Sequence, residues 1–425
     1  MDPSRFVHHR LPPRFFNEER LRHQMNAQGL DGLVVSTSNN VFYLTGFNAL
    51  AQKSDEPRPF ALVISRHEPE HPVLVLPDYY VGAFATHPTW IEDFRPYRGV
   101  MLPFDIDVPQ SALLRFAPSA THDEPWMRSA LSHYAPDMTK ALEKALSDLG
   151  LDRGRVGFDD LRLGQKFMSR DRVIDDAYAI LMSTRSVKTQ GEIAALERAT
   201  SVNRYAIETA IGAWQPGMSY NNLNEVYEHA VVERGGHVHD PGAMVFFNGG
   251  GVDPYISISA GSEDFDLRPG MHVMFDCHGT LGLYCWDGGK TWVVDRQLDA
   301  RSQRVAQATA DAMVEIEAAM RPGVRVSELQ AIGRNVYRRS NVGGADDVII
   351  FFHGLGLSHL DQAMGETAEG SATGDWMMEQ DMVVATHLLY PGSDTSRIWL
   401  EDIGHIQNDG ARSIFGWDFL PHQSG

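Results

Sequence analysis

Residues 272–294 read HVMFDCHGTLGLYCWDGGKTWVV, and two β-rich segments flank the glycines Gly279 and Gly282. This pattern predicts a β-hairpin, because glycine is favoured in tight turns between apolar strands. Asp276 and Asp287 are 11 residues apart, the spacing of directly opposed partners across a two-residue turn. Two adjacent carboxylates in an apolar sheet repel each other unless a proton or a cation lies between them. The alternative is that one aspartate caps a turn while the other faces solvent.

A second polar cluster follows an apolar strand at residues 351–361, FFHGLGLSHLD. His353 stands between that strand and two glycines, which let the backbone turn sharply or approach a ligand closely. His359 and Asp361 come within the same turn, and either could orient a bound substrate or exchange a proton with it. For His359, a place in a surface loop is an equally good interpretation.

Two further apolar strands each carry a polar side chain. His387 lies in VVATHLLY at residues 383–390, and Glu401 lies in IWLEDIGHI at residues 398–406. A lone buried histidine is usually a core residue with one hydrogen bond, but an unpaired buried carboxylate is too costly to lack a partner. The C-terminal half thus offers five oxygen and nitrogen donors, which suit one or two first-row divalent ions. The five are Asp276, Asp287, His353, His387 and Glu401.

The same half of the chain contains an internal repeat, at residues 210–236 and 318–344. Both copies run helix, Pro-Gly, short turn, helix and Gly-Gly, and Pro216 and Pro322 are 106 residues apart. A strand-like apolar run follows each copy. A Pro-Gly pair after a helix is common and could recur by chance. The apolar run that follows both copies indicates a duplication instead.

A domain boundary is predicted near residue 185. Just after it, Thr189 stands three residues before Glu192, which is the capping-box pattern that starts a helix. A chain of 425 residues also exceeds the usual size of one hydrophobic core. We therefore expect two domains, residues 1–184 and residues 185–425.

The N-terminal domain is predicted to be α/β. Its expected helices are at residues 21–25, with a stop at Gly29, and at residues 139–150. Its expected strands are at residues 33–35, 41–44, 60–64 and 73–76. Residues 100–135 are rich in Pro, His and Asp without clear periodicity, and are predicted to be an insertion or a long loop.

Composition narrows the class of protein. The net charge of −19 repels a phosphate backbone, so we expect no nucleic-acid partner. No stretch approaches the roughly 18 apolar residues that a membrane span requires, and the first residues show no signal-peptide pattern. The two cysteines fit a reducing compartment. We expect a cytoplasmic protein with no membrane partner.

The donor residues resemble the metal ligands of the pita-bread metallohydrolases, the superfamily of prolidase, aminopeptidase P, methionine aminopeptidase and creatinase. That pattern has an Asp, a second Asp eleven residues later, a His in HGxG, a Glu in a strand ending in EP, and a final Glu in an ED motif. This chain matches it at Asp276, Asp287, His353 and Glu401.

The resemblance covers essentially the whole chain. Residues 20–47 are similar to a creatinase-type N-terminal domain, and the junction at residues 185–199 is similar to the K-x-x-x-E-I linker of the family. The resemblance implies an α/β (α+β) fold, with a creatinase-type domain at 1–184 and a pita-bread domain with a pseudo-twofold repeat at 185–425. It also implies a homodimer.

Three positions depart from the family pattern. His387 stands where the peptidases keep a Glu that binds metal and shuttles a proton. Tyr255 stands where many members have the His of a PHY motif. His359 comes six residues after His353, a spacing similar to the dimethylsulfoniopropionate lyase branch, which has an Asp there as base. The chain therefore resembles a metal-binding member that has left standard peptidase chemistry.

The resemblance implies a cofactor of one or two divalent ions, of Mn, Fe, Zn or Co. Asp287, His353, His387 and Glu401 are expected to hold one ion, and Asp276 is expected to join Asp287 and Glu401 at a second, weaker site. Because a neutral imidazole replaces a carboxylate at His387, one ion is favoured over two.

The leading hypothesis is a metal-dependent hydrolase that cleaves an amide or another C–N bond in a small polar or dipeptide-like substrate. His359 or Glu401 is the expected base, with Asp361 as a further catalytic candidate. The expected substrate pocket contains His237, His239, Tyr255 and Trp286, although the histidines could equally be loop residues and the aromatic residues simple core. Lyase-type elimination and creatinase-like C–N hydrolysis are the alternatives, and a non-catalytic binding module is the third hypothesis.

Overall fold

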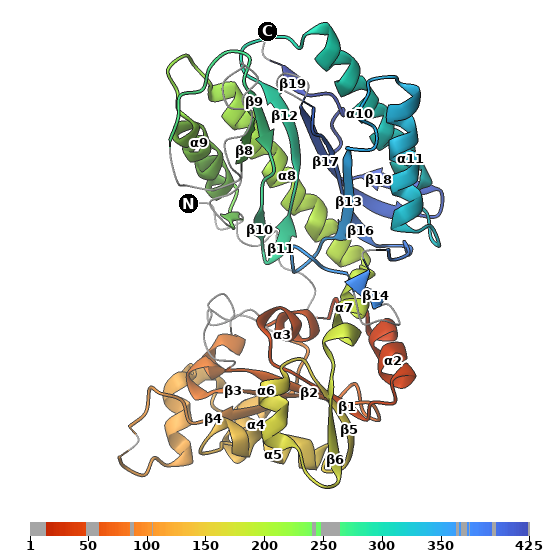
Figure 1. The fold of residues 1–425 in the computed structure, drawn as a ribbon. Helices are drawn as coiled ribbons and strands as arrows, with labels where there is room; N and C mark the ends of the chain where they lie inside the picture. Colours follow the sequence, from red (N-terminus) through yellow and green to blue (C-terminus); the bar gives the residue numbers. More distant parts are fainter. Residues whose placement is uncertain are drawn as a thin grey trace. The chain divides into compact units, whose positions relative to one another are not determined.

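Figure 1 shows a computed structural model of residues 1–425. It describes residues 14–47, 59–85, 89–103, 105–239, 244–247, 264–362, 365–366, 372–373, 375–392 and 397–423. The chain forms two compact units that divide between Arg185 and Ser186, one residue beyond the predicted boundary. Both units combine helices with a sheet, which confirms the predicted α/β class. Within the described ranges, no helix is long and apolar enough to span a membrane.

The N-terminal unit is built on a six-stranded sheet with the order β4-β3-β2-β1-β5-β6. The strands are β1 (Gly32–Val35), β2 (Ala61–Ser65), β3 (Val73–Pro77), β4 (Asp93–Tyr97), β5 (Gly154–Phe158) and β6 (Arg172–Asp176). Its helices are α2 (Glu18–Ala27), α3 (Ser38–Thr45), α4 (Pro125–Ser132), α5 (Met138–Asp148), α6 (Leu161–Gly164) and α7 (Tyr178–Ser186). Every residue of β1, β2 and β3 is buried, as expected for the apolar runs that predicted them.

The prediction of a strand at residues 41–44 is wrong, because these residues lie inside α3. The Asp159 carboxylate accepts a hydrogen bond from the backbone N–H of Thr37 and fixes the start of this helix. Gly46, with a φ of 69°, ends it in the left-handed conformation. The helix is buried on nearly all sides, so its sequence lacks the one-sided periodicity that separates a helix from a strand.

The predicted long loop at residues 100–135 is partly helical. It contains the short 3-10 helices η3 (Gln110–Phe116) and η4 (Ser119–Thr121), followed by α4. Pro125 occupies the first turn of α4, where the missing N–H of proline costs nothing. The remaining 3-10 helices of this unit are η2 (Asp78–Ala85) and η5 (Gln165–Phe167).

The C-terminal unit has one large sheet with the order β13-β16-β17-β12-β9-β8, to which β18 adds at β17 and β19 adds at β12. Its strands are β8 (Met244–Phe247), β9 (His272–Phe275), β12 (Gly289–Val293), β13 (Ile349–Gly354), β16 (Val383–Tyr390), β17 (Ile398–Gln407), β18 (Gly410–Ser413) and β19 (His422–Gln423). A small sheet contains β7 (His237–Val238), β10 (Gly279–Leu281) and β11 (Tyr284–Trp286). The strands β14 (Gly365–Glu366) and β15 (Ala372–Thr373) pair with each other.

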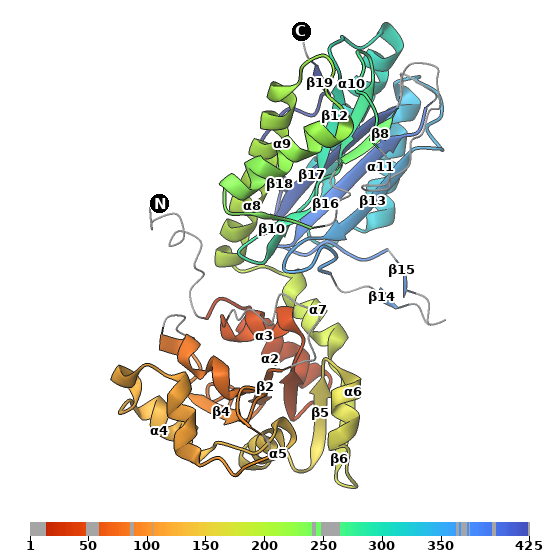
Figure 2. The same ribbon diagram turned by 90° about the vertical axis from the view of Figure 1, so that its left-hand side faces the viewer.

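Two helix pairs pack on this sheet (Figures 1 and 2). The pair α8 and α9 shares one apolar core with β9 and β12, and the pair α10 and α11 shares another with β13, β16 and β17. The helices are α8 (Gln190–Ala213), α9 (Tyr220–Glu233), α10 (Ala300–Ala319) and α11 (Val326–Arg339).

The two helix pairs are linked in the same way, as the internal repeat predicts. Gly217 and Gly323 follow the first helix of each pair with φ values of 93° and 90°. Ser219 and Arg325, which are also 106 residues apart, each form an isolated antiparallel bridge to a later segment. Equivalent positions thus share both a conformation and a contact.

The predicted hairpin is present, but its register differs from the prediction. Gly282 and Leu283 form the two-residue turn between β10 and β11, and both have positive φ. In this register His278 faces Asp287, and Asp276 moves to a diagonal position on the same face. A two-residue shift keeps the face but changes the direct partner.

A buried ion pair anchors the loop that follows β13. Lys188 Nζ lies 3.2 Å from Asp361 Oδ2, and both side chains are almost completely buried. The same oxygen accepts a hydrogen bond from the backbone N–H of Leu357. The loop after His353 is therefore tied to Lys188, two residues before α8 begins.

Glu192 lies beside this ion pair, at the start of α8. It completes the predicted capping box with Thr189 and accepts a hydrogen bond from the Tyr284 hydroxyl. Burial raises the pKa of Glu192 to about 7, although the nearby Lys188 ammonium lowers it.

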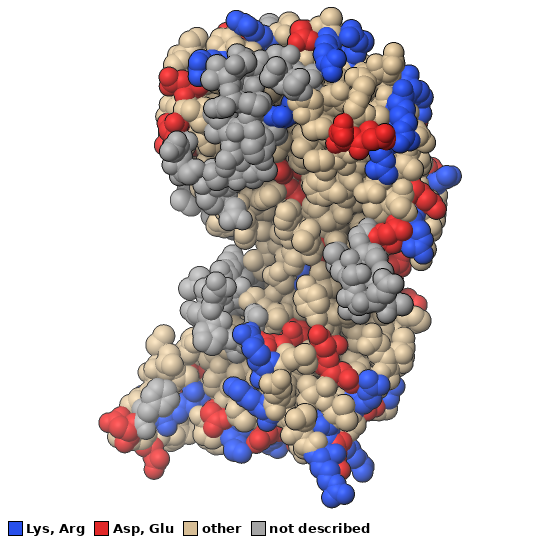
Figure 3. Space-filling model, viewed as in Figure 1, with Lys and Arg blue, Asp and Glu red and all other residues tan. Residues whose placement is uncertain are grey.

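Acidic and basic side chains are interspersed on each unit on the face seen in Figure 3. The net charge of −19 is therefore not gathered in one patch of that face.

The pKa of Glu192 predicts a pH-dependent stability. Between pH 4.5 and about 7 the folded chain keeps a proton that the unfolded chain has lost, so this residue's contribution to stability falls as the pH rises. Glu192→Gln keeps a side chain that can form the capping box, but it removes the carboxyl group that titrates. We expect the unfolding free energy of the variant, relative to wild type, to increase from about pH 5 to about pH 8 in denaturant titrations. Glu225→Gln, at an exposed position, is the control, and equal pH slopes in both variants would contradict the assignment.

Breaking the Lys188–Asp361 pair should be costly. Lys188→Met leaves a buried carboxylate without its cation, which typically costs about 3–5 kcal/mol. Combining it with Asp361→Asn removes that charge and should recover part of the loss. Urea unfolding measures both, and a double variant no more stable than the single one would refute the ion-pair account.

Candidate metal centre

Four buried donor side chains meet on the large sheet of the C-terminal unit. Asp287 lies between β11 and β12, His353 in β13, His387 in β16 and Glu401 in β17. His387 is the direct cross-strand partner of Glu401 on one side and of Phe351 on the other. Because side chains alternate along a strand, this register puts His353, His387 and Glu401 on one face.

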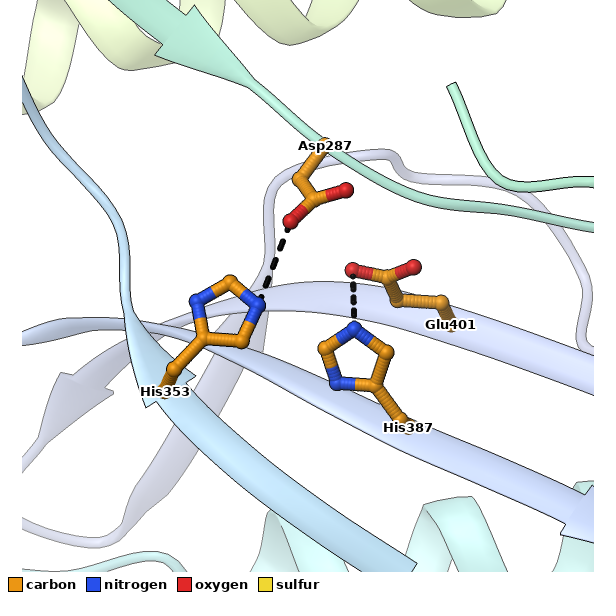
Figure 4. A group of neighbouring side chains, drawn as sticks. All are labelled: Asp287, His353, His387 and Glu401. Atoms are coloured by element: carbon orange, nitrogen blue, oxygen red, sulfur yellow. Dashed lines mark ion pairs between the residues drawn. The ribbon is translucent and has the colours of Figure 1, made fainter. Parts of the chain in front are cut away.

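The four ligand atoms all lie within 4.8 Å of one another. His353 Nε2 is 3.2 Å from Asp287 Oδ2, and His387 Nε2 is 2.9 Å from Glu401 Oε1 (Figure 4). Two ligands held at about 2.0–2.1 Å from one tetrahedral ion lie about 3.3 Å apart. The side chains therefore converge at nearly the spacing of a metal's ligand shell.

The chemistry of the donors also fits a metal ion. Glu401 is fully buried, and although His387 Nε2 lies 2.9 Å from its Oε1, neither carboxylate oxygen accepts a hydrogen bond from the described residues. Such a carboxylate is costly unless a cation compensates it. Two imidazoles and two carboxylates are a donor set that first-row divalent ions accept.

Burial and close neighbours shift the pKa values of three side chains at this centre. Burial, together with the nearby carboxylates of Asp287 and Asp276, holds the pKa of Glu401 well above its ordinary value. Burial holds the pKa of His387 well below its ordinary value, so its imidazole is neutral and has a free lone pair to offer. Burial raises the pKa of Asp287, but hydrogen bonds from three imidazoles outweigh it and hold that pKa well below its ordinary value.

His278 also lies at this centre, although no sequence motif singled it out. Its Nε2 is 2.9 Å from Asp287 Oδ1 and 3.2 Å from Asp276 Oδ1. Asp276 thus reaches the centre beside both His278 and Glu401. The signal in the sequence was the position of His278 two residues after Asp276, on the same face of the strand.

The structure separates the two other catalytic candidates. His359 Nε2 lies 2.5 Å from Asp287 Oδ2, and the His359 side chain is 46% exposed, so it reaches both the centre and solvent. Asp361 instead turns its carboxylate to Lys188 in the interior. The ion pair with Lys188 gives Asp361 a role in holding the loop, which requires no contact with a substrate.

Three of the four residues expected to line a substrate pocket lie on or next to the small sheet of β7, β10 and β11. Trp286 is fully buried in the apolar core of α8 and α9. His237 and His239 are exposed at or next to β7, which pairs with β10. Tyr255 lies outside the described residues.

Comparison with known proteins places this arrangement in a family. The sequence profile of the Creatinase/Prolidase N-terminal domain matches residues 18–172, and that of Metallopeptidase family M24 matches residues 194–408. A curated protein of Bacillus subtilis (strain 168) named "Putative dipeptidase YkvY" is 22% identical in an alignment of 410 positions that covers 93% of this chain and 96% of that protein.

Solved structures of similar fold agree with the profiles. The Xaa-Pro dipeptidase from Bacillus anthracis is 16% identical with a TM-score of 0.66, over 96% of this chain and 98% of that one. The prolidase from Pyrococcus horikoshii OT3 is 16% identical with a TM-score of 0.64, over 94% and 98% of the two chains. Since the second profile covers more than half of the sequence, this chain belongs to metallopeptidase family M24 and carries a creatinase/prolidase N-terminal domain.

Proposed function

We propose that the chain is a metal-dependent hydrolase that cleaves the amide bond of a small, dipeptide-like substrate. The observation that carries this proposal is the convergence of Asp287, His353, His387 and Glu401, with the buried oxygens of Glu401 lacking hydrogen-bond partners among the described residues. Family membership supports the reaction class, and the names of the similar proteins support a dipeptide as substrate.

A divalent ion at this centre would supply a Lewis acid that lowers the pKa of water toward 7. Asp287 and Glu401 bring two negative charges to it, and His353 and His387 bring none. One divalent ion therefore balances these four ligands. Mn, Fe, Zn and Co are all compatible with such a set.

We assign proton transfer to His359 rather than to Glu401. Glu401 is fully buried beside His387, whereas the half-exposed His359 imidazole can contact both a bound substrate and solvent. Its contact with Asp287 orients the ring. In hydrolysis the oxygen of water adds to the carbonyl carbon, the C–N bond breaks, and His359 passes the proton it accepted from water to the leaving amine.

An apolar surface next to the centre suits an apolar residue of the substrate. Ile349 and Phe351 are 47% and 41% exposed, and they share a face of β13 with His353. Phe351 stacks on His387, with ring centroids 3.8 Å apart and an angle of 14° between the rings. A proline or another apolar side chain could bury this surface on binding.

The first test combines metal content with a substrate panel. We expect about one ion per chain by elemental analysis, and cleavage of dipeptides that contain an apolar residue, Xaa-Pro among them. His353→Ala should lower metal content and reduce kcat/KM by more than about 100-fold, because it removes a ligand. His229→Ala, at an exposed position of α9, should change neither.

The panel also contains creatine and dimethylsulfoniopropionate. Turnover of one of these, and of no dipeptide, would replace the proposed reaction while leaving the metal centre in place. Wild-type protein that binds no ion and cleaves no dipeptide would overturn the proposal as a whole.

The second test concerns the pairing of His387 with Glu401. His387→Glu puts two carboxylates in direct cross-strand contact in the interior, and these repel each other unless a cation lies between them. We expect the metal-free variant to melt at a lower temperature than metal-free wild type, and added Zn²⁺ or Mn²⁺ to raise its Tm more than that of wild type. Equal metal-induced shifts in Tm would show that residue 387 does not face the ion.

Assembly and location remain predictions. The family resemblance favours a homodimer, and the composition favours the cytoplasm. Light scattering on the purified protein tests the first, and imaging of the tagged full chain tests the second.

A further inference from the structure

We propose that His278, Asp287 and His359 form a second, weaker metal site that prefers Zn²⁺, and that an ion bound there inhibits the hydrolase. The site itself follows from the geometry of these three residues. Its inhibitory effect rests on the proposed function, because that function assigns proton transfer to His359.

The three side chains are already arranged as ligands. One ligand atom from each lies within 4.8 Å of the other two. His278 Nε2 is 2.9 Å from Asp287 Oδ1, and His359 Nε2 is 2.5 Å from Asp287 Oδ2. The two imidazole rings are neighbours, with centroids 4.4 Å apart. The set differs from the second site predicted from the sequence, which used Asp276, Asp287 and Glu401.

The structure holds these ligands from two sides. The register of β10 and β11 places His278 across from Asp287. The loop that carries His359 is held two residues later by the buried pair of Asp361 and Lys188. Such support strengthens a metal site. Side chains that are free to rotate must be ordered when the ion binds, and this lowers the affinity of the site for the ion.

The donor types set the metal preference. Imidazole nitrogens favour Zn²⁺ over Mn²⁺, which prefers oxygen ligands. The second site has two imidazoles and a carboxylate that it shares with the first site, so it brings less negative charge of its own. Asp276 Oδ1, 3.2 Å from His278 Nε2, adds a neighbouring negative charge. Even with that charge nearby, the second site has three ligands against four, so we expect it to be weaker than the first.

Exposure distinguishes the two sites further. The side chains of His278 and His359 are 27% and 46% exposed, whereas the four ligands of the first site are buried. An ion at the second site can therefore exchange readily with solvent. When bound, it occupies the Nε2 lone pair of His359, which can then no longer accept a proton from water.

Equilibrium dialysis against Zn²⁺ and against Mn²⁺, read by elemental analysis, tests the site without relying on turnover. We expect wild type to bind two Zn²⁺ per chain, the second at least about 10-fold more weakly, but only one Mn²⁺ over the same concentrations. His278→Ala and His359→Gln should each lose the second Zn²⁺ and keep the first. His229→Ala is the control and should keep both. Wild-type hydrolysis should fall as the second Zn²⁺ binds, and Mn²⁺ should not inhibit.

The outcomes separate the two proposals. A wild type that never binds more than one Zn²⁺, or a second Zn²⁺ that persists in both variants, overturns this inference and leaves the hydrolase proposal standing. A second ion that binds without lowering turnover overturns the inhibitory effect. A wild type that binds no ion at all overturns the proposed function itself. Circular dichroism of both variants checks that they fold, and His359→Gln, a half-exposed position, still reports if His278→Ala does not fold.

Discussion

A carboxylate buried in an apolar sheet constrains everything around it. Glu401 sits in the centre of β17, where both of its oxygens lack hydrogen-bond partners among the described residues, and His387 on the next strand faces it directly. The chain can retain such a residue at moderate cost only if a proton or a cation compensates its charge, and a divalent ion bound by all four ligands would do so. The registers of β13, β16 and β17, which bring His353 to the same face, are the means by which the fold assembles the other ligands.

The duplication within the C-terminal unit explains why the centre lies where it does. The first helix pair packs on β9 and β12, near the segment that carries Asp276, His278 and Asp287. The second pair packs on β13, β16 and β17, which carry the other ligands. The two halves meet where β12 pairs with β17, and Gly289 there is the partner of Glu401. Each half thus contributes one side of the ligand set.

Much of this arrangement could be predicted from the sequence, because apolar strands and polar residues within them leave a local signal. The features that were missed depend on contacts between distant residues. Lys188 and Asp361 are 173 positions apart, and no pattern near either of them indicates the pair. The hairpin register depended on where the turn falls, and Leu283 adopts a positive φ that its residue type does not suggest. The strand predicted at residues 41–44 failed because a helix buried on most sides reads like a strand.

Asp287 makes one carboxylate serve several neighbours at once. Oδ2 faces His353 and His359, and Oδ1 faces His278. An ion or a proton that draws electron density from one oxygen makes the other oxygen a weaker ligand. Binding on one side of Asp287 is therefore thermodynamically linked to binding on the other side. By reciprocity, an ion on either side changes the affinity for its neighbour by the same factor in both directions. Cooperativity between the two sides would therefore need no movement of the backbone, only a shared pair of oxygens.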